Sequence, residues 1–119
     1  MDFEFKISLR KNEYNEFQLQ NMDFLKLAPD NTINDLKSYI FDKLENKDGS
    51  PEISELKTAN FKYDIDKRAG SFRLSFLVSR RFCCSEVDSS NHDYIDVTFQ
   101  LENSHILGRA SYFDWTLNN

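Results

Sequence analysis

Two adjacent cysteines and a nearby histidine are the residues of this chain whose types could do chemistry. Cys83 and Cys84 precede His92 in a polar stretch. Arg80 and Arg81 lie just before them and could supply the positive charge that activates a thiolate. A cysteine–histidine pair is a starting point for nucleophilic catalysis, and the same side chains bind transition metals. One alternative is therefore a small enzyme or a metal-binding protein built on Cys83, Cys84 and His92.

The spacing of these residues does not favour either chemistry. Zinc sites usually separate paired cysteines by two or more residues, and adjacent cysteines on a strand point to opposite faces. The chain has three glycines and carries no nucleophile elbow, HExxH motif or phosphate-binding glycine-rich loop. The oxygens of Asp88, Ser90 and Asp93 lack the glycine and glutamate that complete a calcium loop. We therefore expect no catalytic residues, metal or cofactor.

The same stretch is the most acidic part of the chain. Glu86, Asp88, Asp93 and Asp96 follow one another without an intervening lysine or arginine. We interpret residues 83–93 as a long loop between two strands, and such loops are often where a protein meets its partner. The accumulated charge is more than ordinary mixing of surface residues provides. The pattern predicts a surface that binds a cationic protein.

Further candidates for partner binding lie after this loop. Glu102 extends the acidic character along the following strand. Tyr112, Phe113 and Trp115 cannot all lie on one face of a strand, so at least one large aromatic is exposed or belongs to a second core. Tyrosine and tryptophan are frequent anchors of protein interfaces. We expect the partner-binding surface to consist of Glu86, Asp88, Asp93, Asp96, Glu102, Tyr112 and Trp115.

The composition indicates one folded cytoplasmic domain that spans residues 1–119. The 11 Phe, 5 Tyr and 1 Trp can supply an aromatic core. The net charge of -5 repels nucleic acid and anionic membranes, so we expect no direct binding to either. The N-terminus Met1–Phe5 has no signal-peptide pattern, and adjacent cysteines rarely form a disulfide. These features predict a cytoplasmic protein with reduced thiols.

The beginning of the chain predicts a pair of strands. Apolar residues alternate with polar ones over Phe3–Leu9, which is the pattern of a half-buried strand. A second strand is expected over Phe17–Leu27. Because the connection at residues 11–15 is short and polar, the two runs should pair as a hairpin.

An amphipathic helix is expected next, from about Thr32 to Glu45. Asp35 lies three residues after Thr32, which matches a helix-capping pattern. The segment Pro51–Leu56 could add one further helical turn after Gly49 has ended the helix. The apolar stripe that should pack on the sheet consists of Ile33, Leu36, Ile40 and Leu44.

The second half of the chain predicts an antiparallel meander. Apolar residues alternate over residues 61–65, 72–78 and 95–101, with short polar turns or the acidic loop between them. A last strand is expected over about 105–117, where Gly108 indicates a bulge or the close approach of another group. The predicted fold is α+β. It has one antiparallel or mixed sheet of about six strands in the order β-β-α-β-β-β-β, with one helix packed on one face.

The segment Leu25–Lys37 resembles the strand-to-helix passage of ubiquitin-like β-grasp proteins. It reads Leu-Lys-Leu-Ala-Pro-Asp-Asn-Thr-Ile-Asn-Asp-Leu-Lys and follows an expected hairpin of similar length. The resemblance implies a local strand followed by a capped helix. The chain ends in Thr116–Asn119 rather than in two glycines, so we expect no conjugation of the ubiquitin type.

The chain as a whole is similar in kind to bacterial immunity proteins, which are small, acidic, cysteine-poor and cytoplasmic. These proteins neutralise secreted toxins, many of them cationic nucleases, by imitating phosphate charge. The resemblance implies a non-catalytic inhibitor that binds a cognate cationic toxin through its acidic surface. A third alternative is a subunit that oligomerises through an exposed edge strand. The sequence indicates neither which edge is open nor the oligomeric state.

Overall fold

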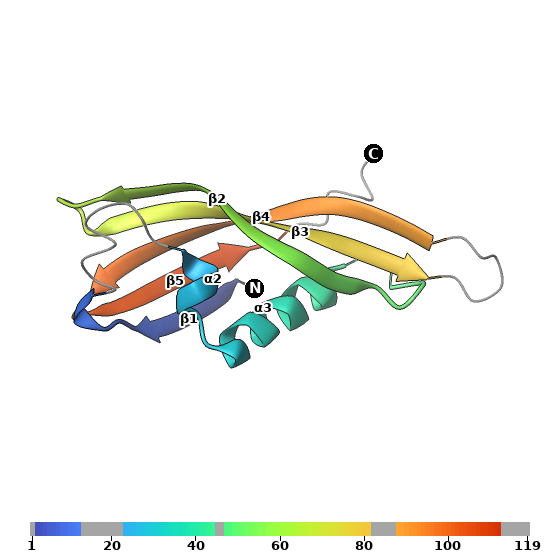
Figure 1. Cartoon of the computed structure of the whole chain (residues 1–119), viewed down its shortest axis with the longest axis horizontal. Coiled ribbons are helices and arrows are strands. Elements are labelled where there is room, and N and C mark those ends of the chain that lie inside the picture. The colour runs from blue at the N-terminus through green and yellow to red at the C-terminus, as the bar shows by residue number, and fades with distance from the viewer. Residues whose placement is uncertain (1, 13–22, 45–46, 82–87, 113–119) are drawn as a thin grey trace.

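The computed structural model describes residues 2–12, 23–44, 47–81 and 88–112. Within these ranges, one antiparallel sheet of five strands and two helices confirm the α+β class (Figure 1). The strand order across the sheet is β1-β5-β4-β3-β2. The elements are β1 (Phe3–Ser8), α2 (Phe24–Leu27), α3 (Asp30–Lys43), β2 (Glu52–Asp64), β3 (Ala69–Arg81), β4 (Asp88–Glu102) and β5 (His105–Ser111).

Strands β2 to β5 form the expected antiparallel meander, but the expected second strand of the N-terminal hairpin is wrong where the structure describes it. β1 pairs with β5, so that Phe5 lies opposite Gly108. Of the predicted second strand, residues 17–22 lie outside the described ranges, and Phe24–Leu27 is helix α2 instead. The N-terminal strand therefore lies next to β5, at the end of the sheet opposite β2.

Helix α2 forms because its first turn is capped locally. The Asp23 carboxylate accepts a hydrogen bond of 3.0 Å from the backbone N–H of Leu25, and Phe24 is buried. Ala28 is the C-cap of the helix, and Pro29 follows it directly. The strand that the β-grasp resemblance implies at this point is therefore a helix.

Helix α3 confirms the predicted amphipathic helix but begins two residues earlier than expected. Its N-cap is Pro29, whose backbone oxygen accepts hydrogen bonds from the N–H groups of Thr32 and Ile33. The expected side-chain cap at Thr32 is wrong, because the N-cap makes no side-chain hydrogen bond. Leu36 and Ile40 are buried on the sheet, as the apolar stripe predicts.

Strand β2 replaces the extra helical turn predicted at Pro51–Leu56. It is interrupted by register shifts between Ser54 and Lys57 and between Ala59 and Lys62. These irregularities contain left-handed residues, since Glu55 has a φ of 52° and Asn60 a φ of 57°. Ile65, predicted as the last core residue of this strand, lies beyond it in a turn and is 50% exposed.

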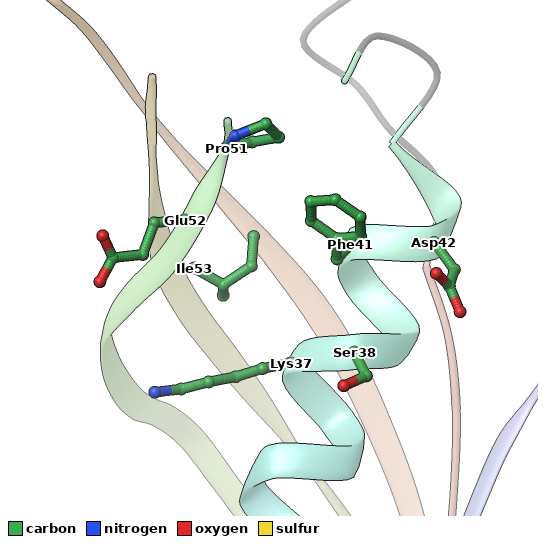
Figure 2. Close-up of a pocket in the computed structure, with 7 residues that line it drawn as sticks. All are labelled: Lys37, Ser38, Phe41, Asp42, Pro51, Glu52 and Ile53. Atoms are coloured by element: carbon green, nitrogen blue, oxygen red, sulfur yellow. The ribbon is translucent and has the colours of Figure 1, made fainter. Parts of the chain in front are cut away.

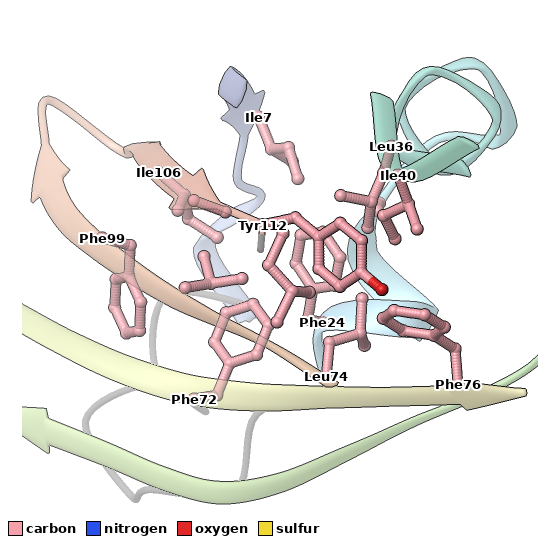
Figure 3. Close-up of a cluster of buried hydrophobic side chains, with 14 of the residues drawn as sticks. Ile7, Phe24, Leu36, Ile40, Phe72, Leu74, Phe76, Phe99, Ile106 and Tyr112 are labelled. Carbon is pink, nitrogen blue, oxygen red and sulfur yellow. The ribbon is translucent and has the colours of Figure 1, made fainter. Parts of the chain in front are cut away.

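The core lies between the helices and one face of the sheet, as Figure 3 shows. The rings of Phe24 on α2 and Phe72 on β3 have centroids 4.9 Å apart. The close approach predicted at Gly108 is confirmed, because a Cβ atom there would overlap the ring of Phe5. The predicted core residues of β3 and β4 are all buried, namely Phe72, Leu74, Phe76, Val78, Ile95, Val97, Phe99 and Leu101.

The long acidic loop predicted at residues 83–93 is partly wrong. β4 begins at Asp88, which is opposite Arg81 in the register of β3 and β4. The segment 88–93 therefore belongs to the sheet, and residues 82–87 lie outside the described ranges. Neither helix in the described parts of the chain is long and apolar enough to cross a membrane.

Candidate protein-binding surface

The sheet has a second face, opposite the helices, which we call the outer face. Because successive side chains of a strand alternate, residues out of phase with the core lie here. On β3 these residues are small hydroxyl side chains interrupted by one arginine and one leucine, and on β4 they are larger and polar. The central part of the outer face consists of Ser71, Arg73, Ser75, Leu77, Tyr94, Asp96 and Thr98.

Arg73 and Asp96 form a two-pronged ion pair in the middle of this surface. The two residues are directly opposite each other in the register of β3 and β4. Arg73 Nε lies 2.9 Å from Asp96 Oδ1, and Arg73 Nη2 lies 3.2 Å from Asp96 Oδ2. The hydrogen bond to Asp96 is the main cause that raises the pKa of Arg73 above its ordinary value. The guanidinium is therefore charged and fixed in direction.

Tyr94 supports the same guanidinium from the side. The Cζ atom of Arg73 lies 3.8 Å from the centroid of the Tyr94 ring, which is a close cation–π distance. Tyr94 is half-buried and lies two residues before Asp96 on the same face of β4. The three side chains form one ordered group on a rigid sheet, and we call it the Arg73 cluster.

A shallow depression adjoins the Arg73 cluster on the side of β2. Its volume is about 260 Å³. It is lined by Arg73 and Asp96 on one side and by Asn60 and Lys62 on the other, at the second register shift of β2. A protein partner could insert a polar side chain here and meet both signs of charge.

Two of the predicted partner-binding residues lie inside the protein. Asp93 is 6% exposed and Tyr112 is 5% exposed, and the Tyr112 hydroxyl donates a hydrogen bond to the Asp93 carboxylate. The interpretation of Asp93 as a loop residue is wrong, because it lies on β4 in phase with Ile95 and faces the core. A partner cannot reach either side chain in this structure.

The other predicted residues have different positions. Asp96 and Glu102 are exposed, Asp96 within the Arg73 cluster and Glu102 at the turn between β4 and β5. Asp88 begins β4. Glu86 and Trp115 lie outside the described ranges.

The charges of the described surface are balanced. All 15 lysines and arginines lie within the described ranges, together with 15 of the 20 acids. The outer face follows this pattern, since Arg109 pairs with Asp2 at 3.2 Å and with Glu4 at 3.1 Å. The excess of acids lies elsewhere in the chain, in Glu13, Glu16, Glu45, Glu86 and Asp114.

The alternative site built on cysteine and histidine is only partly described. Cys83 and Cys84 lie outside the described ranges. His92 is exposed on β4 and stands opposite Leu77 of β3. Within the described ranges, the structure contains no group of three or more His, Cys, Asp and Glu side chains arranged to hold a metal ion.

A second concavity lies between α3 and the edge strand β2 (Figure 2). Its volume is about 410 Å³. Phe41 of α3 is 36% exposed and faces Pro51 and Ile53 of β2 across the groove. Lys37, Asp42 and Glu52 surround this apolar floor with mixed charge. The groove is open, and it brings together none of the predicted site residues.

Comparison with known protein families, curated proteins and solved structures finds no match to this chain. The fold and the Arg73 cluster define an α+β protein with an ordered, polar sheet face. The alternation of β3 puts Arg73 out of phase with the core, but no local pattern connects it to Tyr94 on β4. The sequence does contain one indication of this contact. Tyr94 is an aromatic residue that alternates with the core residues of β4, which places its ring on the outer face.

Proposed function

We propose that this chain is a non-catalytic protein-binding module that inhibits a cognate cationic protein, as immunity proteins inhibit toxins. The observation that carries the proposal is the Arg73 cluster, an arginine held against a tyrosine ring and a carboxylate on an exposed sheet face. Arginine and tyrosine dominate the energetics of protein interfaces. Small hydroxyl residues around such anchors provide adaptable hydrogen bonds, as in antibody combining sites.

The cluster is already ordered before a partner binds. Arg73 loses side-chain freedom to its ion pair with Asp96 and to its contact with Tyr94. Ordering long side chains at an interface normally opposes association, so a surface that is ordered in advance binds more tightly for the same contacts. This physical advantage supports the outer face as the contact surface, in place of the buried Asp93 and Tyr112.

Electrostatics support a cationic partner. The chain carries a net charge of -5, which attracts a positively charged protein at separations up to about the Debye length, beyond which salt screens the interaction. Asp96 and Glu102 are the predicted partner-binding acids that the structure describes as exposed. Asp96 orders Arg73 in the middle of the outer face. Glu102, at the turn between β4 and β5, contributes mainly to the rate of association, because rim charges steer an encounter more than they hold a complex.

The test uses the product of the neighbouring reading frame as the first partner, with affinity measured by calorimetry. Arg73→Ala and Tyr94→Ala should each weaken binding by about 30-fold or more, the loss expected of a hot-spot residue. Lys37→Ala, on the helix side of the molecule, is the matched control and should bind like the unmodified chain. Native affinity in folded Arg73→Ala and Tyr94→Ala variants would place the interface elsewhere.

A further inference from the structure

The two edges of the sheet differ in their suitability for pairing with another strand. β2 is the longer edge, but two register shifts and the left-handed residues Glu55 and Asn60 break its hydrogen-bonding row. Bulges of this kind protect an edge from pairing. β1, at the opposite end of the strand order, pairs with β5 without any shift over Phe3–Ser8.

Among the described residues, the backbone groups of β1 that do not bond to β5 belong to its charged residues. The N–H of Leu9 donates a hydrogen bond of 2.8 Å to the oxygen of Ser104, which continues the register of β1 and β5. In an antiparallel pair, hydrogen-bonded residues alternate, so the odd-numbered residues of β1 bond to β5. The N–H and C=O groups of Glu4 and Lys6 therefore point to the other side, the edge of the sheet.

The charge pattern of this edge is complementary to itself. If two copies of β1 pair antiparallel about Phe5, Glu4 of each copy lies directly opposite Lys6 of the other copy. A two-fold axis at Glu4 would place two glutamates opposite each other, and an axis at Lys6 would oppose two lysines. Opposite charges in directly opposed positions stabilise a strand pair, and like charges destabilise it. Of these three registers, the charges of Glu4 and Lys6 favour the one about Phe5.

The same register also matches the apolar face. Residues directly opposite each other point to the same face, so Phe3 would meet Ile7 of the second copy on the core side. The two Phe5 side chains would adjoin at the axis. Phe3 and Phe5 are only half-buried in the single chain, so the pairing would cover aromatic surface that this chain leaves partly open.

We propose that this chain forms a symmetric dimer in which the β1 strands of two copies pair antiparallel about Phe5 and join the two sheets. Isologous contacts of this kind are the commonest route to a homodimer, and backbone hydrogen bonds at a sheet edge provide the affinity. Because β1 has six residues, the contact is small and the dissociation constant should lie in the micromolar range, about 1 to 100 μM. The dimer does not depend on the proposed inhibitory function.

The experiment measures the oligomeric state of the full chain by sedimentation velocity. The variant Glu4→Lys places a lysine at position 4 opposite Lys6 of the other copy. The variant Lys6→Glu places a glutamate at position 6 opposite Glu4 of the other copy. Each variant should raise the dissociation constant about tenfold or more. An equimolar mixture of the two restores complementary charges and should form a mixed dimer. Isotopic labelling of one variant distinguishes that species by native mass spectrometry.

Two control variants test whether the edge charges of β1 hold the dimer together. Arg109→Gln removes the ion pair that Glu4 makes within one chain and should still dimerise, since it leaves the edge charges intact. Lys57→Glu changes a charge on β2 and should also dimerise. A monomeric unmodified chain at about 100 μM would overturn the proposal, since that concentration reaches the weakest affinity expected of it. So would an unchanged dissociation constant in both single variants, no mixed dimer, or loss of the dimer in Lys57→Glu.

Discussion

The hydroxyl group of Tyr112 donates a hydrogen bond of 2.5 Å to Oδ2 of Asp93 in the interior of the protein. The other carboxylate oxygen, Oδ1, accepts a hydrogen bond of 2.8 Å from the backbone N–H of Tyr94. The N–H of Tyr112 in turn donates to the hydroxyl of Tyr39 on α3 at 3.3 Å. These bonds connect the residue after β5 to β4 and to the helix, so a carboxylate predicted to meet a partner instead stabilises the fold.

Replacing Tyr112 by phenylalanine should destabilise the protein. The change keeps the ring, which contacts Phe76 with centroids 5.6 Å apart, but removes a donor from a buried carboxylate. The free energy of unfolding should fall by about 1.5 to 3 kcal/mol, as expected for a hydrogen bond to a charged group. Chemical denaturation measures it. Tyr94→Phe, whose ring lies on the outer face, is the control and should change stability little. Equal stability of the two variants would contradict the structural role of the Tyr112–Asp93 bond.

Replacing Gly108 by alanine should also be costly, for a different reason. The added Cβ atom would overlap Cζ of Phe5, so the ring of Phe5 or the backbone of one strand must shift. Overpacking of this kind typically costs about 1 to 3 kcal/mol. Truncating the ring in a Gly108→Ala, Phe5→Leu double variant should recover part of the loss relative to the sum of the single changes. If the loss of stability in the double variant equals the sum of the losses in the two single variants, measured by thermal unfolding, the Phe5 ring is not what the added Cβ atom collides with.

Replacing Ile40 by alanine tests the position of the helix face. Ile40 is 0% exposed and lies on the stripe of α3 that contacts the sheet. The cavity should lower the free energy of unfolding by about 2 to 5 kcal/mol. Ser38→Ala, on the exposed side of the same helix, should leave it nearly unchanged. If the melting temperature of Ile40→Ala equals that of the unmodified chain, α3 does not pack on the sheet through this stripe.

Neutralising the exposed acids should affect association more than folding. In an Asp96→Asn, Glu102→Gln variant, the rate of association with a cationic partner should fall and depend less on salt concentration. The free energy of unfolding should change by less than about 1 kcal/mol, because the ion pair of Asp96 with Arg73 is exposed. Stopped-flow mixing at several salt concentrations gives the rates. An unchanged salt slope would argue against steering by these two residues.

Local alternation and helical spacing determined much of this fold from the sequence. The phase of Phe72–Val78 and of Ile95–Leu101 predicted the buried residues of β3 and β4, because side-chain direction in a strand alternates by covalent geometry. The spacing of Leu36 and Ile40 predicted the buried side of α3 for a similar reason. The same alternation, continued toward the start of β4, predicts that Asp93 faces the core and Tyr94 the outer face. The assignment of residues 83–93 to a loop left this prediction unmade.

Only the tertiary structure decided the contacts between segments distant in sequence. The pairing of β1 with β5 brings Phe5 onto Gly108, and no local pattern distinguishes that partner from the nearer Phe17–Leu27 segment. The register of β3 and β4 opposes Arg73 to Asp96, and a shift of one residue would have put them on opposite faces. Helix α2 formed where alternation suggested a strand, because the Asp23 cap and the burial of Phe24 outweighed it. Pairing and burial are collective properties of the folded chain, and for that reason they decided which predicted site residues reached the surface.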